Sequence, residues 1–512
     1  MMPTSTSRPR HTATAVLVIS IAAPVSPVAA TGETGAALVS LTPAPSRPAA
    51  PNLVFIMADQ WRGTALGCLG TEPVRTPHLD RLASEGLHFT DAVSSYPVSS
   101  PARGMLMTGR YPLGSRVTGN CNSDTAPYGV ELPTESRCWS DVLSEHGYEL
   151  GYIGKWHLDA PRRPYVDTRN NRGRVAWNEW CPPERRHGFG YWLAYGTYDD
   201  HLRPMYWTTD APRDSFHYVD QWGPEFEADR AVDYIRNEGG RLRDPQKPFA
   251  LVVSMNPPHT GYELVPQRYK DFYRDLDVEA LCAAPVVPPR GTRNGDYFRR
   301  SVRDYYACMT GVDEQVGRIV AELERAGLTE QTLVIFTSDH GDCMGMHDHV
   351  GKNVCYDEAM RVPMILRWPG TIEARRDTTA MPAFADLGPT MLSLMGLEAY
   401  IPAEVETYDW ARYVMKPGTA APTAQQPYYF VQPARPETGM RGWRTPRYTF
   451  AVRADGKSAP AYILFDRQTD PWQLRNAAAD CPDVVRTLTQ QLKDWLRRTD
   501  DPFVRWLEAE EN

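Results

Sequence analysis

The sequence predicts an α/β protein with a large, mixed and mostly parallel β-sheet between helices, followed by a small C-terminal α+β subdomain. Continuous apolar runs such as NLVFIMA at 52–58 are typical of strands buried on both faces of a parallel sheet. These runs alternate with helical patterns along the chain, as expected for a doubly wound sheet. The 512 residues, 42% of them hydrophobic and 23% charged, suffice for one large domain with an appendage.

Four apolar strands and two helices outline the predicted large domain, residues 51–400. After the strand at 52–58, apolar spacing predicts a helix over 76–87, with Pro77 in its first turn. The other expected elements are strands at 149–153, 248–254 and 333–337 and a long helix at 304–326, which Gly327 ends.

The rest of the chain, residues 401–512, is predicted to form the small subdomain. Residues 400–440 are rich in Pro, Thr, Ala and Gln, which is the composition of a linker. Short antiparallel strands are expected at 448–452 and 461–465. Apolar residues recur on one side of 483–498, which predicts an amphipathic helix.

Residues 1–30 have the pattern of a signal peptide. Arg8 and Arg10 precede a short apolar run at 13–23, and small residues follow it. The run is shorter than the ~20 residues that a membrane-spanning helix needs, and no other stretch has the pattern of a membrane span. Residues 31–50 are predicted to be a flexible leader. We therefore expect an exported protein, periplasmic or secreted.

Charge and cysteine content exclude several classes of protein. A net charge of −8 argues against nucleic-acid binding through phosphate contacts, although a local cationic pocket could still bind an anionic substrate. The nine cysteines include no CxxC pair, so neither a structural zinc site nor a thioredoxin-type motif is expected.

Polar clusters follow the ends of the predicted strands. In open α/β sheets the ligand site lies beyond the carboxyl ends of the strands, so separate clusters are expected to converge there. Asp59 follows the strand at 52–58 and Asp339 follows the one at 333–337. Two carboxylates, with an amide oxygen from Gln60 and a ring nitrogen from His340, favour a divalent metal site. Either aspartate alone could instead cap a helix.

Lysines and histidines come next to the same strand ends. Lys155 and His157 are two residues apart, so in an extended segment they point the same way. His259 follows the strand at 248–254, and Lys352 lies just past the Asp339 loop. Together these four side chains predict a pocket that binds an anion and transfers protons. Singly, each could be an ordinary surface or turn residue.

The stretch VSSPARGMLMTGRYP at 98–112 places serines and an arginine around a proline. Pro101 restricts the backbone, which predicts a rigid turn followed by a helix over 104–109 with its N-terminus toward an anion. A serine here could be a nucleophile or merely a helix cap, and these residues alone do not decide between the two. No GxSxG occurs, so a Ser-His-Asp hydrolase is not supported.

The same stretch resembles the signature of type I sulfatases, (Cys or Ser)-x-Pro-x-Arg followed by Thr-Gly-Arg. Ser99, Pro101 and Arg103 take the signature positions, and 108–110 is the tail. The resemblance covers about residues 51–500 and implies an alkaline phosphatase-like fold. The other motifs that follow the family's order are NLVFIMADQ, GKWHLD, NPPHTGY, TSDHGD, GKNVCYDEAMRVPMILRWPG, DLGPTMLSLMGL and LFDRQTDPWQLRN.

The resemblance also implies a mechanism. In that family the first signature residue is oxidised after translation to formylglycine, whose hydrated aldehyde attacks sulfur. Ser99 is thereby implied to be the precursor of the nucleophile and a metal ligand, with Arg103 steadying it. The other implied roles are Asp59, Gln60, Asp339 and His340 as metal ligands, Lys155 and Lys352 as sulfate-binding cations, His157 as the base that releases sulfate and His259 as the acid that protonates the leaving alcohol.

The sequence departs from the commonest family pattern at three positions. Ser99 stands where many members have cysteine, which implies maturation by a radical S-adenosylmethionine enzyme. Gln60 and His340 stand where many members have Asp and Asn. One bound Ca²⁺ is the family habit, and the imidazole leaves Mg²⁺ or Mn²⁺ open.

Residues 165–207 form a long aromatic and charged insertion after GKWHLD. Aromatic faces with Asp, His and Arg suit sugar recognition, although most of these aromatics are expected simply to pack the domain. Asp200, His201 and Arg203 are the predicted substrate-binding residues. Some sulfatases of polysaccharide-degrading bacteria carry a similar segment, so a sulfated glycan, with galactose or N-acetylgalactosamine sulfate, is the expected substrate.

Two other functions remain open at this point. One is a phosphodiesterase or phosphonate monoester hydrolase, because such relatives share the fold and can share the Asp-Gln and Asp-His metal pairs. The other is a non-catalytic protein that binds sulfated glycans and whose Ser99 is never oxidised.

Overall fold

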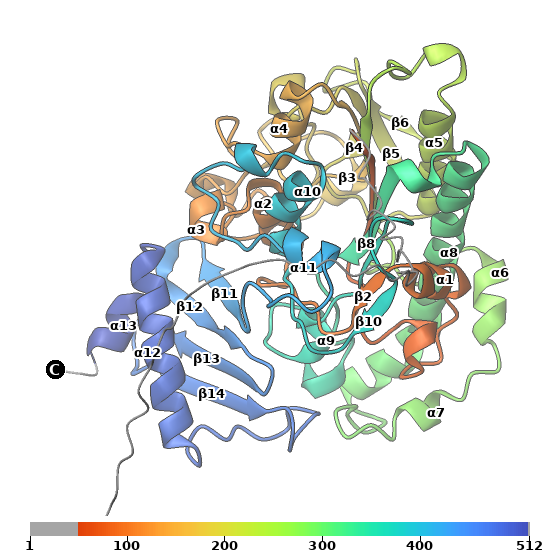
Figure 1. Cartoon of the computed structure of the whole chain (residues 1–512). Coiled ribbons are helices and arrows are strands. Elements are labelled where there is room, and N and C mark those ends of the chain that lie inside the picture. Colours follow the sequence, from red (N-terminus) through yellow and green to blue (C-terminus); the bar gives the residue numbers. More distant parts are fainter. Residues whose placement is uncertain (1–49, 510–512) are drawn as a thin grey trace, which may run out of the picture. The chain divides into compact units, whose positions relative to one another are not determined.

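A computed structural model of the chain describes residues 50–509 and contains a ten-stranded and a four-stranded sheet (Figure 1). The predicted signal peptide, 1–30, and the predicted leader up to residue 49 lie outside the described residues. The large sheet has the strand order β10-β2-β9-β8-β1-β7-β3-β4-β5-β6. Its strands are β1 Asn52–Ala58, β2 Leu87–Phe89, β3 Glu149–Lys155, β4 Tyr191–Tyr195, β5 Met205–Thr208, β6 His217–Tyr218, β7 Phe249–Met255, β8 Thr332–Ser338, β9 Met364–Arg367 and β10 Arg375–Asp377.

The centre of the large sheet is parallel. Strands β8, β1, β7, β3 and β4 pair in parallel, whereas β9 and β5 pair antiparallel on either side of them. Connections between parallel neighbours must cross over the sheet, and this places helices on both of its faces. The predicted fold class, a mixed and mostly parallel sheet between helices with an alkaline phosphatase-like architecture, is confirmed.

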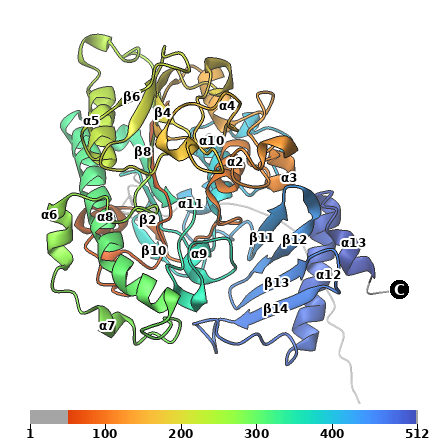
Figure 2. The same ribbon diagram turned by 180° about the vertical axis from the view of Figure 1, so that it is seen from behind.

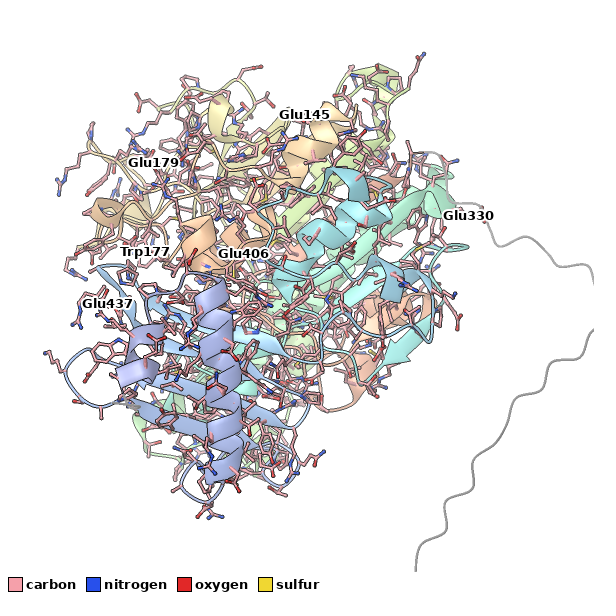
Figure 3. The ribbon with its side chains drawn as sticks, turned by 60° about the vertical axis from the view of Figure 1, so that its left-hand side comes forward. Glu145, Trp177, Glu179, Glu330, Glu406 and Glu437 are labelled. Atoms are coloured by element: carbon pink, nitrogen blue, oxygen red, sulfur yellow. The ribbon has the colours of Figure 1, made fainter. Side chains whose placement is uncertain are left out.

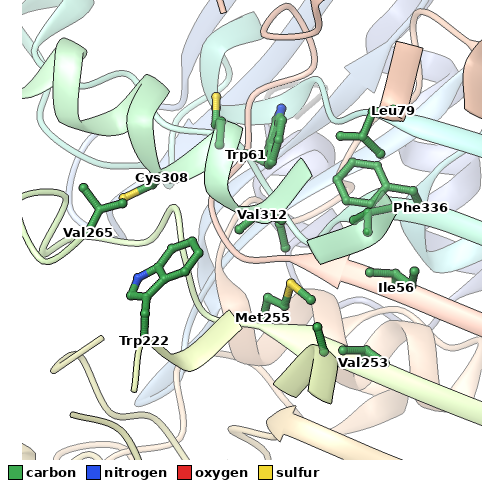
Figure 4. Close-up of a cluster of buried hydrophobic side chains, with 14 of the residues drawn as sticks. Ile56, Trp61, Leu79, Trp222, Val253, Met255, Val265, Cys308, Val312 and Phe336 are labelled. Carbon is green, nitrogen blue, oxygen red and sulfur yellow. The ribbon is translucent and has the colours of Figure 1, made fainter. Parts of the chain in front are cut away.

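Alternate side chains of the central strands pack into two separate cores. On one face Ile56, Val253 and Phe336 meet Trp61 and Val312 beneath helices α1, α5 and α8 (Figure 4). On the other face the intervening strand residues pack against α2, α4 and α10. These helices are α1 Pro77–Glu85, α2 Ser99–Thr108, α4 Trp139–Glu145, α5 Gly223–Arg236, α8 Arg293–Arg325 and α10 Leu387–Leu394. The shorter helices are α3 Pro112–Ser115, α6 Gln267–Lys270, α7 Val278–Leu281, α9 Asp357–Met360 and α11 Ala411–Met415.

Two predicted helices have different bounds in the structure. The long helix α8 begins at Arg293 rather than at residue 304, because the Thr292 hydroxyl caps it by accepting a hydrogen bond from the backbone of Gly295. The helix predicted at 104–109 begins already at Ser99. Pro101 falls in its first turn, where the missing N–H is not needed, so proline starts this helix instead of forming a separate turn.

The small sheet has the order β11-β12-β13-β14 and is antiparallel. The linker predicted over 400–440 is wrong at its end, because 426–440 belongs to the first two strands. Pro427 is tolerated because β11 is an edge strand. The last two helices pack on this sheet, and Glu437 of β12 bonds Arg505 of α13 at 3.1 Å (Figure 3). The elements are β11 Gln426–Gln432, β12 Arg435–Arg444, β13 Tyr448–Ala454, β14 Ala461–Asp466, α12 Pro482–Arg498 and α13 Val504–Glu508.

The small sheet is bonded to the large domain. Arg444 of β12 forms ion pairs with Asp357 at the start of α9 and with Asp91. Seen from behind, α9 lies beside the small sheet (Figure 2). Within 50–509, none of the helices combines the length and the apolar character that crossing a membrane requires.

Candidate active site

The parallel register brings the polar strand ends together. Ala58 of β1 is paired with Ser338 of β8, so Asp59 and Asp339, one residue further on, lie next to each other. On the other side of β1, strand β7 leads into Asn256 and His259. Lys155 ends β3, the following strand in the sheet. The predicted convergence at the carboxyl edge of the sheet is thus present.

Asp59, Asp339 and His340 form a buried group whose ligand atoms all lie within 4.8 Å of one another. His340 Nε2 is 3.5 Å from Asp59 Oδ1 and 3.6 Å from Asp339 Oδ1. Nδ1 of His340 donates to the carbonyl of Gly341 at 2.9 Å, so the Nε2 lone pair points into the group. Carboxylate oxygens with a neutral imidazole are a donor set that fits a divalent cation.

Ser99 faces this group, and Ser100 does not. Ser99 Oγ lies 2.9 Å from His340 Nε2 and 3.4 Å from Asp59 Oδ1. Ser100 Oγ instead donates to the carbonyl of His157 at 2.8 Å and accepts from the backbone of Cys121 at 3.0 Å. Local sequence does not distinguish the two serines, but their positions in α2 do. Ser99 points at the acidic group, whereas Ser100 bonds the backbone of neighbouring loops.

Gln60 has a left-handed backbone conformation, with φ 71°, and its amide lies beside the acidic group. Its Oε1 accepts a hydrogen bond from Lys352, and its Nε2 donates to Tyr262 at 3.0 Å and to Asp342. In this conformation the amide oxygen that the sequence assigns to a metal faces the Lys352 ammonium group.

Arg103, one turn along α2, joins the two aspartates. Its Nη2 donates to Asp59 at 3.1 Å and its Nε to Asp339 at 3.0 Å. Nη1 donates to the Lys155 carbonyl at 2.7 Å and to Ser254 Oγ at 2.8 Å. The guanidinium is thereby locked in one orientation at the base of the site.

Two cations lie above the aspartates. Lys155 Nζ is 2.7 Å from Asp59 Oδ2 and 3.0 Å from the amide oxygen of Asn256. Lys352 Nζ contacts Gln60 and lies 3.1 Å from His259 Nε2. Two ammonium groups from different segments, one beside Asp59 and one beside Gln60, have the charge and chemistry that suit a tetrahedral anion.

The aspartates respond differently to this environment. Burial opposes the charge of both, but Lys155 and the neighbouring histidines outweigh it and hold the pKa of Asp59 well below its usual range. The pKa of Asp339 is raised, because burial and the charge on Asp59 together exceed the attraction of Arg103. A further positive charge beside these two buried carboxylates would favour the state in which both are ionised.

The two histidines of the pocket occupy different positions. His157 has φ 55°, so it leaves the extended course of β3 and the prediction that it points the same way as Lys155 by simple alternation fails. Its ring is buried and neither ring nitrogen has a hydrogen-bond partner. Burial, Lys155 and Arg103 hold the pKa of His157 well below its usual range, so the ring is a neutral base.

His259 lies where the cluster opens to solvent. Its side chain is 14% exposed, whereas those of Asp59 and Lys155 are at most 1% exposed. Burial, Lys352 and Lys155 lower the pKa of His259 to about 4. Its Nδ1 is 3.1 Å from Asp199 Oδ1, a residue to which the sequence analysis assigned no role.

The three predicted substrate-binding residues are placed differently. His201 is buried and donates from Nε2 to the carbonyls of His259 and Thr260, at 3.2 and 3.1 Å, so it holds the loop that carries His259. Asp200 pairs with Arg169 at 3.6 Å. Arg203 pairs with Asp220 at 3.0 Å, and both of these side chains are mostly exposed. Asp200 and Arg203 thus bond surface residues rather than the buried cluster.

Four further residues support the cluster and were missed. Ser254 and Asn256 accept from Arg103 and Lys155, and Asp342 accepts from Gln60. Asp199 accepts from Asn256 at 3.2 Å and bonds His259. The signal for Asn256 and Asp342 was available, because both stand inside the strand-end motifs NPPHTGY and TSDHGD.

Sequence comparisons agree with this geometry. Residues 51–397 match the family described as Sulfatase, and 345–500 match the one described as N-sulphoglucosamine sulphohydrolase, C-terminal. An endo-4-O-sulfatase of Bacteroides thetaiotaomicron is 37% identical over 88% of this chain and 93% of its own length. An ulvan-active sulfatase of Formosa agariphila is 34% identical over 84% of this chain and 77% of its own.

Among solved structures, that of yidJ from Bacteroides fragilis, a sulfatase candidate, has a TM-score of 0.87. Its sequence is 61% identical, and the match covers 90% of this chain and 98% of that one.

Proposed function

The chain belongs to the sulfatase family, and from that premise we propose that it removes sulfate esters from a sulfated carbohydrate with a nucleophile made from Ser99. The observation that carries this proposal is the orientation of Ser99, whose Oγ faces Asp59 and His340 while Ser100 is bonded to backbone. Oxidised to formylglycine, residue 99 would supply the attacking oxygen as an aldehyde hydrate.

We propose that Asp59, Gln60, Asp339, His340 and residue 99 hold one divalent metal ion. Ca²⁺ is the ion that the family habit favours, and the imidazole of His340 keeps Mg²⁺ and Mn²⁺ as alternatives. When bound, the ion would add the positive charge that lets both aspartates ionise and would offset negative charge developing at the nucleophile and sulfate. Arg103 keeps the two carboxylates in place and steadies residue 99.

Lys155 and Lys352 are proposed to bind the sulfate oxygens. Lys155 also contacts the uncharged Asn256 at 3.0 Å and Lys352 the uncharged His259 at 3.1 Å, so an anion that replaces these two contacts gains charge-assisted ones. Such preorganised cations stabilise the charge that accumulates on a transferring sulfuryl group, and they need no rearrangement to do so.

The proton transfers are assigned to the two histidines. His157 is neutral, buried and without a partner on either ring nitrogen, which suits a base that takes a proton from residue 99 when sulfate is released. His259 lies at the open side of the cluster, where the alcohol part of a substrate must remain, and this suits an acid that protonates the leaving oxygen.

A carbohydrate substrate is supported by the relatives and by an aromatic side chain near the site. The names of two relatives specify 4-O-sulfate and ulvan as what those enzymes act on. Trp177, labelled in Figure 3, belongs to the insertion at 165–207 and is half-buried. Its ring centre is 6.4 Å from that of His157. An aromatic ring at this place could pack against a sugar ring, and we propose a galactose or N-acetylgalactosamine sulfate.

We also propose that the protein is exported, to the periplasm or beyond, and that a radical S-adenosylmethionine maturase oxidises Ser99. The pattern of residues 1–30 supports export, and the serine at the signature position supports this class of maturase.

Mass spectrometry of the peptide that carries Ser99, from protein made in its native host, tests the proposal. We expect loss of two hydrogens and an aldehyde that a hydrazine reagent traps. Intact serine throughout would contradict it and favour a glycan-binding protein. Turnover of an aryl sulfate and of an aryl phosphodiester is then compared on the same sample; clear preference for the phosphodiester would favour a phosphonate monoester hydrolase-type activity instead.

A further inference from the structure

The carboxylate of Asp199 connects the insertion after β4 with the loop that carries His259. Its Oδ1 lies 3.1 Å from His259 Nδ1 and accepts from Asn256 Nδ2 at 3.2 Å. Its Oδ2 accepts from Asn170 Nδ2 at 3.1 Å. The side-chain amides of Asn170 and Asn256 thus hold the carboxylate beside Nδ1 of His259.

These contacts determine which way the His259 ring faces. An ammonium group can only donate, so Nε2 of His259 accepts from Lys352 and Nδ1 carries the ring proton, 3.1 Å from Asp199 Oδ1. Nε2 then points away from Asp199 and toward Lys352 Nζ, 3.1 Å away. The backbone is held as well, because His201 Nε2 donates to the carbonyls of His259 and Thr260. Thr260 Oγ1, 3.2 Å from Nδ1, is the other partner at that nitrogen, but it is uncharged.

The charge on Asp199 counteracts the lysines. Burial, Lys352 and Lys155 disfavour a protonated His259, whereas Asp199 favours it. Asp199 itself stays ionised, because the attraction of His259 and Lys155 exceeds the effect of its burial and holds its pKa far below the usual range. A permanent negative charge therefore lies beside Nδ1 of His259, whereas Lys352 lies at Nε2.

We propose, on the basis of the sulfatase function above, that Asp199 is a positioning residue which orients His259 and favours its protonated form for transfer to the leaving oxygen. As sulfur gains its bond to the nucleophile, its bond to the leaving oxygen breaks and that electron pair stays on the oxygen. The oxygen takes the proton from His259 Nε2. The imidazole is left neutral, with its Nδ1 proton still beside Asp199.

The exposure of the site agrees with this assignment. The side chain of Asp199 is 38% exposed and that of His259 is 14% exposed, whereas Asp59 and His340 are fully buried. His259 is also more exposed than His157, the other histidine assigned to proton transfer, which suits the side at which the alcohol part of a substrate leaves. A sulfate group between the two lysines would also occupy Lys352 and free His259 Nε2.

Asp199→Asn, which keeps size and shape but removes the charge, tests the proposal on enzyme whose Ser99 oxidation has been verified. The probes are 4-nitrophenyl sulfate, which needs little help from an acid, and phenyl sulfate, whose leaving group is far more basic. We expect kcat/KM for phenyl sulfate to fall about 10²-fold and that for 4-nitrophenyl sulfate by less than about threefold. Asp220→Asn, a change of the same kind at an exposed position, is the matched control and should alter neither value.

Equal losses on both probes, or no loss on either, would overturn the proposal, since a merely structural role does not depend on the leaving group. A second measurement is the double variant with His259→Ala. If Asp199 acts through His259, Asp199→Asn should reduce the rate by less than about twofold in that background. A full further loss there would also overturn it. If the loss of rate in His259→Ala is the same for both probes, His259 is not the acid that the proposed function assigns. This outcome is distinguishable from a failure of the role of Asp199 alone.

Discussion

Arg103 of the active site and Arg441 of the small sheet are both buried arginines bonded to carboxylates, yet their surroundings differ. Arg441 donates to both oxygens of Asp501, at 2.6 and 3.2 Å, and to four backbone carbonyls. Its charge is matched by one carboxylate. Around Arg103, two aspartates pair with Arg103 and Lys155, a second lysine contacts Gln60, and the unpartnered His157 ring is buried in the same region.

The difference shows what separates a structural ion pair from a reactive site. Burial and short ion pairs are common to both regions, so neither marks function by itself. What distinguishes the Arg103 region is that charges do not balance pairwise and that a buried titratable ring, His157, lacks partners on both nitrogens. These are the conditions under which a metal ion and an anionic substrate gain the most on binding. Substitutions should therefore affect catalysis around Arg103 and stability around Arg441.

The largest effect is expected for Ser99→Ala. It removes the oxygen that faces Asp59 and His340 and with it the precursor of the nucleophile, so sulfate release should fall on the order of 10⁵-fold or more. Thermal unfolding should shift little, because Ser99 bonds only side chains of the site. Ser100→Ala is the matched control: it should cost about 1 kcal/mol of stability through its two backbone contacts and leave much of the activity. An equally inactive Ser100→Ala enzyme would contradict the distinction between the two serines.

Arg103→Lys should have the next largest effect. Lysine keeps the charge but cannot bond both aspartates and Ser254 at once, so the positions of Asp59 and Asp339 are no longer fixed. We expect kcat to fall about 10³-fold, the size typical for loss of one preorganised electrostatic group. Steady-state sulfate release, with metal content measured on the same samples, checks this. An enzyme that retains its metal and its kcat would show that Arg103 is structural, like Arg441.

The large domain and the active site differ in how far the sequence predicts them. Strands β1, β3, β7 and β8 are predictable within two residues because a strand buried on both faces is a continuous apolar run. Residues directly after these strands must converge, so Asp59 and Asp339 follow from topology alone. Strand β11 escapes prediction because it is an edge strand with a proline in it.

Contacts between loops could not be predicted from the sequence. Asp199 and His259 are far apart in the sequence, so no local pattern indicates their contact. The adjacent Asp200 was predicted to bind substrate instead. His157 adopts a positive φ that no rule of alternation predicts. In physical terms, strand ends are positioned by backbone pairing, whereas loop side chains are positioned by tertiary packing that is specific to this chain.

Arg441→Met should destabilise the protein without slowing the folded enzyme. It leaves Asp501 buried and uncompensated, which costs about 3 kcal/mol of unfolding free energy. Urea unfolding measures the loss, and kcat at a temperature where the variant remains folded should stay within about twofold of the parent. Adding Asp501→Asn should recover part of the stability, because the unpaired charge is then gone. A large loss of kcat in the folded variant would mean that the small sheet contributes to the site.

Arg203→Ala should have the smallest effect, and it tests whether Arg203 contacts the substrate. Its guanidinium pairs with Asp220 on the surface and lies over the ring of Tyr218, 4.9 Å from its centre. Exposed pairs of this kind contribute about 0–1 kcal/mol, so the free energy of unfolding should fall by no more than that. We expect kcat/KM on a sulfated oligosaccharide to change by less than about threefold. His201→Ala, only two residues away, should do more, because His201 holds the carbonyl of His259. A tenfold rise in KM for Arg203→Ala alone would instead show that Arg203 contacts the substrate. The substrate-binding region would then include the exposed Arg203–Asp220 pair.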